Sequence, residues 1–346
     1  MVTFFDSHGV NGRFCAETDA ATGPAVSVVV PVYKGVRFLR EAIESLKAQT
    51  FRDWECICVD DGSTDGSGAL ADELASEDAR VRVFHRPNGG TSVARNFALK
   101  QVRGRYVAFL DEDDVYRPEF LQVLYDAAVR TGADIVGCDN VEFEEKSHPV
   151  FTGEVPPSSC WKVADRPMLA EWMSRLHAGI PFSVWLNLYR RELACGHDFP
   201  PHVRVEQDMV WHYTLMPQVG KYVRIPWAGY AWRASSTGGY LHPDAESLIS
   251  WTRSFRLVVE EVVPALRLDA EQRRRLLDEI SRACQWHIWR TLRDGLALSR
   301  DQSSRLRRGL RGLARHGIDV RRHLGRKKRL KWSLFMLTGL TAWVRK

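Results

Sequence analysis

Apolar runs of strand length alternate with segments of helical spacing through the first 140 residues of the chain. The run VSVVVPV at 26–32 is nearly all apolar, which is typical of a strand buried on both faces of a sheet. Strands are predicted at 26–32, 54–59, 81–85, 106–110 and 134–138. Helices are predicted at 38–48, after the turn that follows the second strand, at 92–102 and at 118–132. This alternation predicts βαβ units, and therefore an α/β fold with a parallel sheet and helices on both faces.

The pattern weakens after a Pro-rich segment, SHPVFTGEVPPSSC, at 147–160. The chain from 166 to 233 is rich in Trp and less periodic, and helical spacing returns from Ser247 with one interruption at Pro264. The predicted organisation is a flexible extension at 1–25, an α/β domain at 26–240 with halves 26–140 and 141–240, and a helical region at 241–346.

The chain of 346 residues is long enough for one large domain with an appendage, or for two domains. Its 45% hydrophobic and 27% charged residues are typical of a globular protein. The net charge of +6 is unevenly distributed, because 14 Lys and Arg but one acid, Asp319, occur from Ser303 onward. The rest of the chain is therefore mildly acidic, and the basic tail indicates an anionic partner, either nucleic acid or a membrane.

The cysteines and the first residues bear on the compartment. Seven cysteines are dispersed without a CxxC pair, which predicts reduced thiols and a cytosolic location. Residues 1–25 lack a basic segment followed by an apolar core, so no signal peptide is predicted there.

No GxGxxG follows a strand and no GxxxxGK[ST] occurs, which disfavours a dehydrogenase and a P-loop enzyme.

Four adjacent acids, DEDD at 111–114, follow the strand predicted at 106–110. Their mutual repulsion is unfavourable unless water or cations relieve it. One interpretation is a solvated turn. The other is a cation site, because α/β folds bind their ligands at the carboxyl ends of the strands.

The other predicted strands also end in residues that can bind ligands. Tyr33 follows the first strand, where a ring can stack on a base, and Asp60 and Asp61 end the second, where a carboxylate can accept from a base or a ribose. Gly89 and Gly90 permit close backbone approach before the helix that carries Arg95. Each piece alone is equally typical of a turn, a solvated face or core packing.

Together, four ordered pieces resemble the family 2 inverting glycosyltransferases of the GT-A fold: VSVVVPVYKG, CICVDDGSTDGS, NGGTSVARN and YVAFLDEDDVYRPEFL. The later blocks FSVWLNLYRREL, VEQDMVW and YAWRASSTGG are also similar to that family. The resemblance is strong over 26–140, thinner to about 240, and absent from the extension and the helical tail. It implies a Rossmann-like, mostly parallel sheet that binds a nucleoside diphosphate sugar.

The resemblance also implies site residues. Asp111 and Asp113 match the family's DxD element, which would bind Mg²⁺ or Mn²⁺, with Asp111 on the ribose side. Hard oxygen ligands shared with phosphates suit these ions. The residues implied to contact the nucleotide sugar are Pro31, Tyr33, Asp60, Asp61, Arg95, Asp111 and Arg233. Ser235 and Ser236 are further candidates for the diphosphate, and His242 for the metal, although a lone His is more often structural.

The family's catalytic base lies in a Glu-Asp-x-x-aromatic element, which here reads QDMVW, so the resemblance places the base at Asp208. Gln207 replaces the usual acid and Glu206 stands one position earlier, so Glu206 is kept as the alternative base. Lys34 also replaces the family's Asn after the first strand.

The implied reaction is transfer of a hexose from a nucleoside diphosphate sugar, with UDP the expected nucleotide, to a hydroxyl of a glycan acceptor, with inversion at the sugar carbon. Synthesis of an envelope polysaccharide, lipopolysaccharide or capsule is the expected context. Five Trp residues form either an acceptor platform or ordinary core: Trp172, Trp185, Trp211, Trp227 and Trp232. The alternatives are transfer of another activated group on the same fold and a catalytically silent protein whose basic tail binds nucleic acid. The silent protein is disfavoured because the acids and the Gly-rich pieces are intact.

The end of the basic tail joins a cationic cluster at 326–331 to an apolar run at 332–344. That run is shorter than the roughly 20 residues of a transmembrane helix. One hypothesis is a peripheral anchor at the inner face of the cytoplasmic membrane, which would present a lipid-linked glycan to the site. The alternative is a helix packed on the protein with its basic face in solvent. Nucleic acid ranks third, because the apolar run suits lipid better than phosphate.

Overall fold

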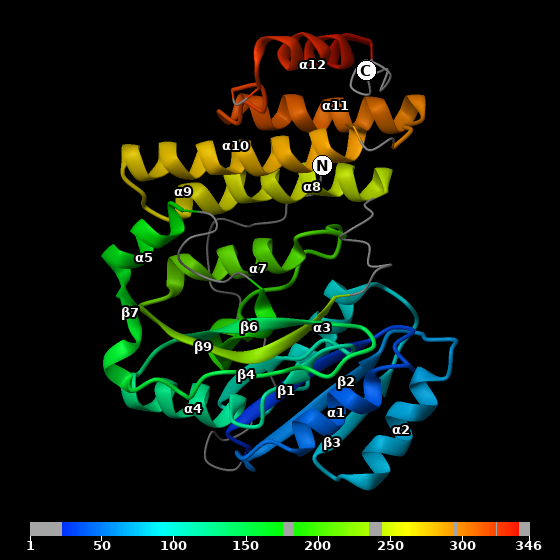
Figure 1. Ribbon diagram of the computed structural model, residues 1–346, viewed down its shortest axis with the longest axis vertical. Coiled ribbons are helices and arrows are strands. Elements are labelled where there is room, and N and C mark those ends of the chain that lie inside the picture. Colours follow the sequence, from blue (N-terminus) through cyan, green and yellow to red (C-terminus); the bar gives the residue numbers. More distant parts are fainter. Residues whose placement is uncertain (1–22, 176–182, 235–243, 294–295, 323, 339–346) are drawn as a thin grey trace.

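The computed structural model describes residues 23–175, 183–234, 244–293, 296–322 and 324–338. A twisted sheet with flanking helices forms one end of the molecule, and a stack of helices forms the other (Figure 1). Most of the predicted extension, together with Ser235, Ser236 and His242, lies outside the described residues.

The sheet is mixed but mostly parallel in its N-terminal half. Its strand order is β3-β2-β1-β4-β8-β6-β9-β5, with β7 paired to β9. The strands predicted from the sequence are β1 (Val26–Val32), β2 (Trp54–Asp60), β3 (Val81–His85), β4 (Tyr106–Phe109) and β6 (Ile135–Glu144). The strands not predicted are β5 (Val115–Tyr116), β7 (Lys162–Asp165), β8 (Asn187–Arg190) and β9 (Lys221–Ala234). Strand β8 lies antiparallel between β4 and β6, and β9 runs parallel to β6.

Helices cover both faces of the sheet, as predicted. Helices α1 (Leu39–Lys47), α2 (Ser67–Glu77) and α4 (Phe120–Thr131) bury their apolar residues with Val28 and Val30 of β1. Helix α3 (Thr91–Leu99) packs with Val29 on the opposite face. Successive residues of a strand point to opposite faces, so the valines of β1 serve both layers.

The C-terminal half adds helices that share a core with α3 and the sheet. They are α5 (Arg166–Met173), α6 (Arg191–Cys195), α7 (Gln207–Leu215), α8 (Ala245–Leu257), α9 (Val263–Ala265), α10 (Ala270–Arg293), α11 (Arg300–Arg315) and α12 (Arg326–Thr338). One cluster of buried residues extends from Phe109 of β4 through Trp211 of α7 to Phe335 of α12. The helical end is therefore packed continuously onto the sheet.

The predicted interruption at Pro264 occurs at the end of a long helical segment. Helix α8 continues into a π-helical turn at Val258–Val262, and α9 ends at Ala265, one residue after the proline. Proline cannot donate a backbone hydrogen bond, so irregular helix at this point is expected.

Two further predictions can be compared with the structure. Cys56, Cys58, Cys138, Cys160 and Cys284 are free thiols. Cys195 is disulfide-bonded, so the prediction of reduced thiols throughout is wrong there. In the part of the chain that the structure describes, no helix is both long enough and apolar enough to cross a membrane.

Candidate active site

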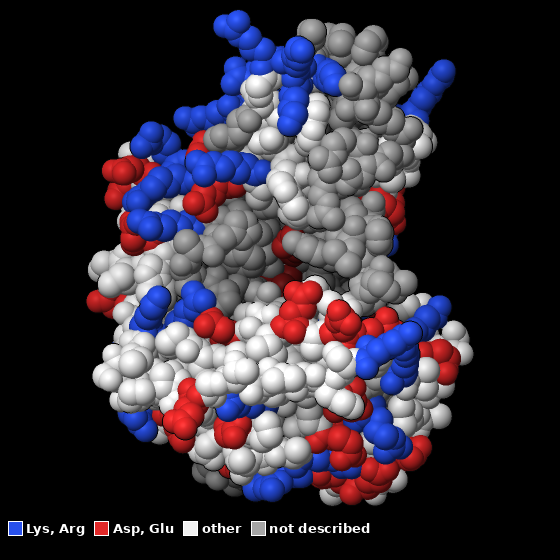
Figure 2. Space-filling view, in the orientation of Figure 1, with Lys and Arg blue, Asp and Glu red and all other residues white. Residues whose placement is uncertain are grey.

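The candidate site lies where β1, β2 and β4 end on the same edge of the sheet, facing the start of α7 (Figure 1). The parallel registers Val32↔Asp60 and Val29↔Phe109 bring the loops after these strands together. Asp and Glu side chains lie around the hollow between the sheet and the helical end in Figure 2. The residues predicted from three separate strand ends therefore form one site.

The first two of the four acids after β4 have distinct partners. Asp111 Oδ1 accepts a hydrogen bond from Arg95 Nη2 at 2.8 Å. Glu112 turns toward the loop after β1, where its Oε1 accepts from the Tyr33 N–H at 3.3 Å. A Cβ at Gly35 would lie 2.5 Å from Glu112 Cγ, so this close packing requires glycine. Burial raises the pKa of Glu112 to about 8, with smaller contributions from Asp113 and Asp111.

The last two acids differ from each other even more. The Asp114 carboxylate is buried and accepts from the Tyr230 hydroxyl at 2.7 Å and from the Arg233 N–H at 2.8 Å, both on β9. Burial raises the pKa of Asp114. The Asp113 carboxylate, in contrast, accepts no hydrogen bond from any other described residue, and burial followed by repulsion from Asp111 raises its pKa to about 6. Asp114 is therefore a structural residue, and Asp113 is the acid whose oxygens remain available.

The pair Asp111 and Asp113 fits a hard divalent cation, because a cation between them would relieve the repulsion that disfavours two ionised carboxylates. No group of three His, Cys, Asp or Glu side chains within the described ranges could hold a metal by itself. Any ion bound here would need further oxygen ligands, as Mg²⁺ typically obtains from water and substrate phosphates.

Arg95 connects the DxD acids to the predicted base. Its guanidinium donates to Asp111 from one terminal nitrogen and to Asp208 from the other, and its side chain is only 2% exposed. Burial opposes the charge of Arg95, but Asp208 and Asp111 outweigh it and raise the pKa of the guanidinium. The predicted contact of Arg95 with ribose or phosphate stays a prediction, and the structure adds a bridging position that the sequence analysis missed.

Asp208 lies in the first turn of α7, where an acid is stabilised by the positive end of the helix dipole. Its side chain is 21% exposed, and burial raises its pKa while Arg95 lowers it in part. Glu206, the alternative base, is the residue before this helix and has a left-handed φ of 62°. Burial raises the pKa of Glu206 to about 7. Of the two candidate bases, Asp208 and Glu206, only Asp208 is linked to Asp111 through Arg95 among the described residues.

Some of the residues predicted to bind the nucleotide are exposed, and the others are buried or already hydrogen-bonded within the protein. Tyr33 is 45% exposed beyond β1, with Lys34 Nζ 5.2 Å from its ring centre, whereas Pro31 is buried within β1. Asp60 accepts from the Ser63 N–H at 3.0 Å and lies 3.1 Å from His85 Nδ1. Tyr33 is therefore the most accessible of the residues predicted to hold the base.

Asp61 is fixed by the loop after β3. Its carboxylate accepts from the N–H groups of Gly89 and Gly90, at 3.0 and 2.7 Å for Oδ2, and from the Arg86 guanidinium. Arg86 was not predicted, although it directly follows the strand at 81–85 and strand ends were the signal for the other residues.

Arg233 is buried, with 3% of its surface exposed, and its guanidinium is fully engaged. It donates to Glu41, to the Asp113 carbonyl at 2.7 Å and to the Glu145 carbonyl at 3.2 Å. This arrangement ties β9 to α1 and to the acidic loop. The predicted diphosphate contact of Arg233 stays a prediction, and it would require these bonds to rearrange.

The five Trp residues do not form one platform. Trp211 stacks on Phe199 and Trp227 is buried, so both are core residues, and Trp172 packs edge-on against Tyr222. Trp232 is half-buried on β9. Trp185 is half-buried and stacks on Tyr230 with ring centres 4.4 Å apart.

Trp185 is the one of the five with a link to the acids. The hydroxyl of Tyr230, on which it stacks, accepts from the Asp111 N–H at 3.3 Å and donates to Asp114. Tyr230 had no signal in the sequence, because only the pairing of β9 beside β6 and β5 brings it here.

Known structures agree with this fold. The structure of Staphylococcus aureus TarS 1–349 superposes with a TM-score of 0.64 at 20% identity, over 92% of this chain and 89% of that one. A mannosyltransferase, PcManGT from Pyrobaculum calidifontis, gives a TM-score of 0.55 at 14% identity, over 89% and 90%. These similarities establish the GT-A fold, as predicted.

Residues 27–192 match the family described as Glycosyl transferase family 2. Over these residues the chain matches the family 2 glycosyltransferases, and this confirms the resemblance seen in the sequence. It is 40% identical over 171 residues to the uncharacterized glycosyltransferase EpsJ of Bacillus subtilis, covering 49% of each chain. It is 37% identical over 121 residues to the glycosyltransferase GlyG of Streptococcus pneumoniae, covering 35% of this chain and 40% of GlyG. The chain thus spans about half the length, or less, of these curated relatives.

Proposed function

We propose that this protein is a metal-dependent, inverting glycosyltransferase that moves a hexose from a nucleoside diphosphate sugar to a hydroxyl of a glycan acceptor. The observation that carries the proposal is the buried bridge in which Arg95 joins Asp111 to Asp208. This bridge places the acids suited to bind a metal ion and the donor diphosphate beside the Asp208 carboxylate, which is suited to deprotonate an acceptor. Structures of TarS with UDP and UDP-GlcNAc support a UDP-sugar as the donor.

In this proposal Asp111 and Asp113 hold Mg²⁺ or Mn²⁺ together with the diphosphate of the donor. The structure of PcManGT in complex with GDP-Man and Mn²⁺ supports this assignment. The bound ion would neutralise charge on the departing diphosphate. Tyr33 stacks on the base, and Asp60 and Asp61 accept from the base or ribose once Arg86 shifts or is shared. Pro31, Arg95 and Arg233 support these contacts from buried positions.

Asp208 acts as the general base. Its carboxylate accepts the proton of the acceptor hydroxyl while that oxygen attacks the anomeric carbon from the face opposite the diphosphate. The bond to the diphosphate breaks as the new glycosidic bond forms, and the configuration at that carbon inverts. Arg95 orients Asp208 and opposes the rise in the pKa of Asp208 that burial causes.

The acceptor in this proposal is a glycan of an envelope polysaccharide, lipopolysaccharide or capsule, carried on a lipid at the cytoplasmic face of the membrane. The half-buried Trp185 is the Trp side chain best placed to contact an acceptor sugar, since it stacks on Tyr230 beside the acids. Aromatic side chains commonly line such sites and orient ligands with a few polar groups.

A donor screen tests the proposal. Purified protein is incubated with a panel of UDP-, GDP- and TDP-hexoses, and release of free nucleotide is measured with Mn²⁺, with Mg²⁺ and with EDTA. We expect slow hydrolysis of at least one donor, with water replacing the acceptor, and its loss in EDTA. Absence of release from every donor, or release that EDTA leaves unchanged, would contradict the metal-dependent transfer.

A further inference from the structure

The first turn of α12 carries an unfavourable charge arrangement. Arg326, Lys327, Lys328 and Arg329 are consecutive and exposed, and no acid occurs in that turn. The N-terminal end of a helix has a positive partial charge, so cations there are repelled by the helix and by one another. This repulsion is unfavourable, and an external anion would relieve it.

Two of these four cations already have internal roles. Lys328 Nζ lies 5.5 Å from the ring centre of Trp289, and Arg329 Nε donates to the Leu324 carbonyl at 2.7 Å. Arg326 and Lys327 make no contact of either kind with the described residues. Their charges are therefore available to a partner.

The apolar side of α12 is occupied by the protein itself. Trp332 and Phe335 are 3% and 0% exposed and belong to the core shared with α10 and α11. Insertion of this part of the apolar run into a bilayer would require the helix to leave its core. Any membrane contact by the described part of α12 must therefore use charge.

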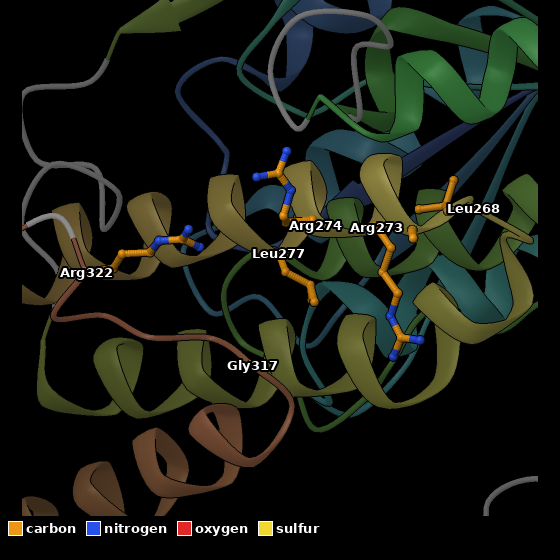
Figure 3. A pocket seen from close by; sticks show the side chains of 7 residues that line it. Leu268, Arg273, Arg274, Leu277, Gly317 and Arg322 are labelled. Atoms are coloured by element: carbon orange, nitrogen blue, oxygen red, sulfur yellow. The ribbon is translucent and has the colours of Figure 1, made fainter.

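A second basic feature adjoins this turn. A cavity of about 490 Å³ lies at the start of α10 and is lined by Leu268, Ala270, Arg273, Arg274, Leu277, Gly317 and Arg322 (Figure 3). Figure 3 shows Arg273 and Arg322 on either side of Leu277, while Arg274 extends from α10 in another direction. Arg329 Nη2 donates to the Arg322 carbonyl at 3.1 Å, which ties the first turn of α12 to the segment that borders the cavity.

Nearby acids neutralise only part of this charge. Asp278 pairs with Arg322 at 3.2 Å, and Asp319 pairs with Arg321 at 3.0 Å. Asp269 accepts from the Gln272 N–H at 2.8 Å and so caps α10. Arg273 and Arg274 are exposed and form no ion pair with the described residues. Figure 2 shows Lys and Arg side chains gathered over the end of the molecule that α11 and α12 form.

We propose that Arg273, Arg274, Arg322, Arg326 and Lys327, here called the basic end, dock the protein on the phosphate groups of an anionic lipid bilayer. Guanidinium and ammonium groups attract such surfaces without insertion. The Trp289 ring that Lys328 contacts and the Trp332 ring of α12 are both buried, so neither offers a stacking platform for nucleic acid bases. The inference rests on the proposed function only in that docking would bring the site to a lipid-linked acceptor.

Vesicle flotation tests the basic end. The full chain is mixed with vesicles of phosphatidylcholine alone or with 30% phosphatidylglycerol, at low and at high salt. Two double variants are compared with wild type, Arg326→Gln with Lys327→Gln and Arg273→Gln with Arg274→Gln. At low salt we expect binding only to the anionic vesicles, and each pair should lower the partition coefficient about 30-fold, since each charge contributes about fivefold. A truncation at Gly325 is unsuitable, because it also removes Trp332 and Phe335 from the core.

The matched control replaces Lys100 and Lys162 by Gln, which removes the same charge. Both side chains are exposed and have no partner among the described residues. This control should change flotation less than threefold. No binding by wild type, an equal loss in the control, or equal binding to neutral vesicles would overturn the proposal, as would tighter binding to RNA than to anionic vesicles. Donor hydrolysis measured without vesicles should be unchanged in all variants. Flotation without hydrolysis would overturn the proposed function alone, and hydrolysis without flotation would overturn the basic end alone.

Discussion

The two halves of the candidate site hold their carboxylates in different ways. In the half at 26–140, the acids lie at or just after the ends of parallel strands, and Asp61 is fixed by the backbone N–H groups of Gly89 and Gly90 from the same half. In the half at 141–240, Asp208 lies in the first turn of α7 and is fixed by a side chain from the other half, Arg95. Asp61 is thus held by backbone groups of its own half, whereas Asp208 depends on one ion pair that joins the two halves.

This difference suggests a division of labour. Loops at strand ends offer several oxygens and N–H groups in fixed positions, which suits binding of a diphosphate and its cation. A single carboxylate held by a buried cation suits proton transfer, because its position and its charge are both controlled. Substitutions in the two halves should therefore change different steps of the reaction.

The largest effect is expected in the donor half. Asp113→Ala should abolish metal-dependent turnover, a loss of at least about 10⁴-fold, because it removes the available ligand from the cation site. The fold should survive, since no other described residue donates to this carboxylate. Nucleotide release with Mn²⁺ is the measurement. The control is Asp126→Ala, an exposed acid on α4 whose carboxylate accepts from Gln122. Near wild-type turnover of Asp113→Ala would show that the metal is held elsewhere.

A second substitution tests the acceptor half. Asp208→Asn should lower turnover by roughly 10²–10⁴-fold, the scale of general-base catalysis, while donor affinity is largely retained. Glu206→Gln is the matched comparison, because Glu206 lies two residues away and lacks the link to Asp111 through Arg95. Turnover and nucleotide affinity are measured separately. A larger loss in Glu206→Gln, or loss of donor affinity in Asp208→Asn, would move the role of the base.

The connection between the halves can be tested at Arg95. Arg95→Lys keeps the charge but cannot donate to Asp111 and Asp208 from two nitrogens of one planar group. We expect kcat to fall about 10²-fold, because Asp208 is less well positioned, with nucleotide affinity changed less than tenfold. If Arg95 acts mainly on the donor phosphates, nucleotide affinity should fall and kcat for bound donor should not. Arg86→Lys provides the donor-side comparison, since Arg86 contacts Asp61.

The same contrast explains what the sequence could predict. The strands at 26–32 and 81–85 coincide with β1 and β3, and β1 was clear because a buried parallel strand is a nearly continuous apolar run. The acids after β4 were predicted as a group, but their separate roles depend on Tyr230 and Arg95, which arrive through tertiary contacts. Strand β9 was not predicted, because its 14 residues mix buried and half-buried positions without strict alternation.

The Trp-rich segment at 166–233 shows what could not be predicted from the sequence. Composition alone could not separate the core residue Trp211 from the site-adjacent Trp185, because both lie in apolar surroundings. Their difference depends on which strand and helix each contacts, and those contacts span long stretches of sequence. The bridging role of Arg95 was hidden for the same reason, since its partner Asp208 is 113 residues away.

The smallest expected effect concerns how α7 is held in the acceptor half. His212 is 0% exposed, and its Nδ1 lies 2.9 Å from the Tyr189 hydroxyl of β8. Burial lowers the pKa of His212 to about 3, so the folded protein keeps it neutral. Below about pH 6.5 the unfolded chain binds a proton that the folded protein does not, and the free energy of unfolding therefore decreases as the pH falls.

This contribution can be isolated with His212→Gln, which keeps an acceptor near Tyr189 but does not titrate. The variant should be less stable than wild type at pH 7.5, and the gap should narrow by about 1.4 kcal/mol at pH 5.5, because only wild type loses stability through His212. Buried acids with raised pKa, such as Glu206, act in the opposite direction but are common to both proteins and cancel. Urea unfolding at the two pH values gives the measurement. If the free energies of unfolding of the two proteins change in parallel with pH, His212 has the same pKa in the folded and unfolded states. Burial would then not lower the pKa of His212.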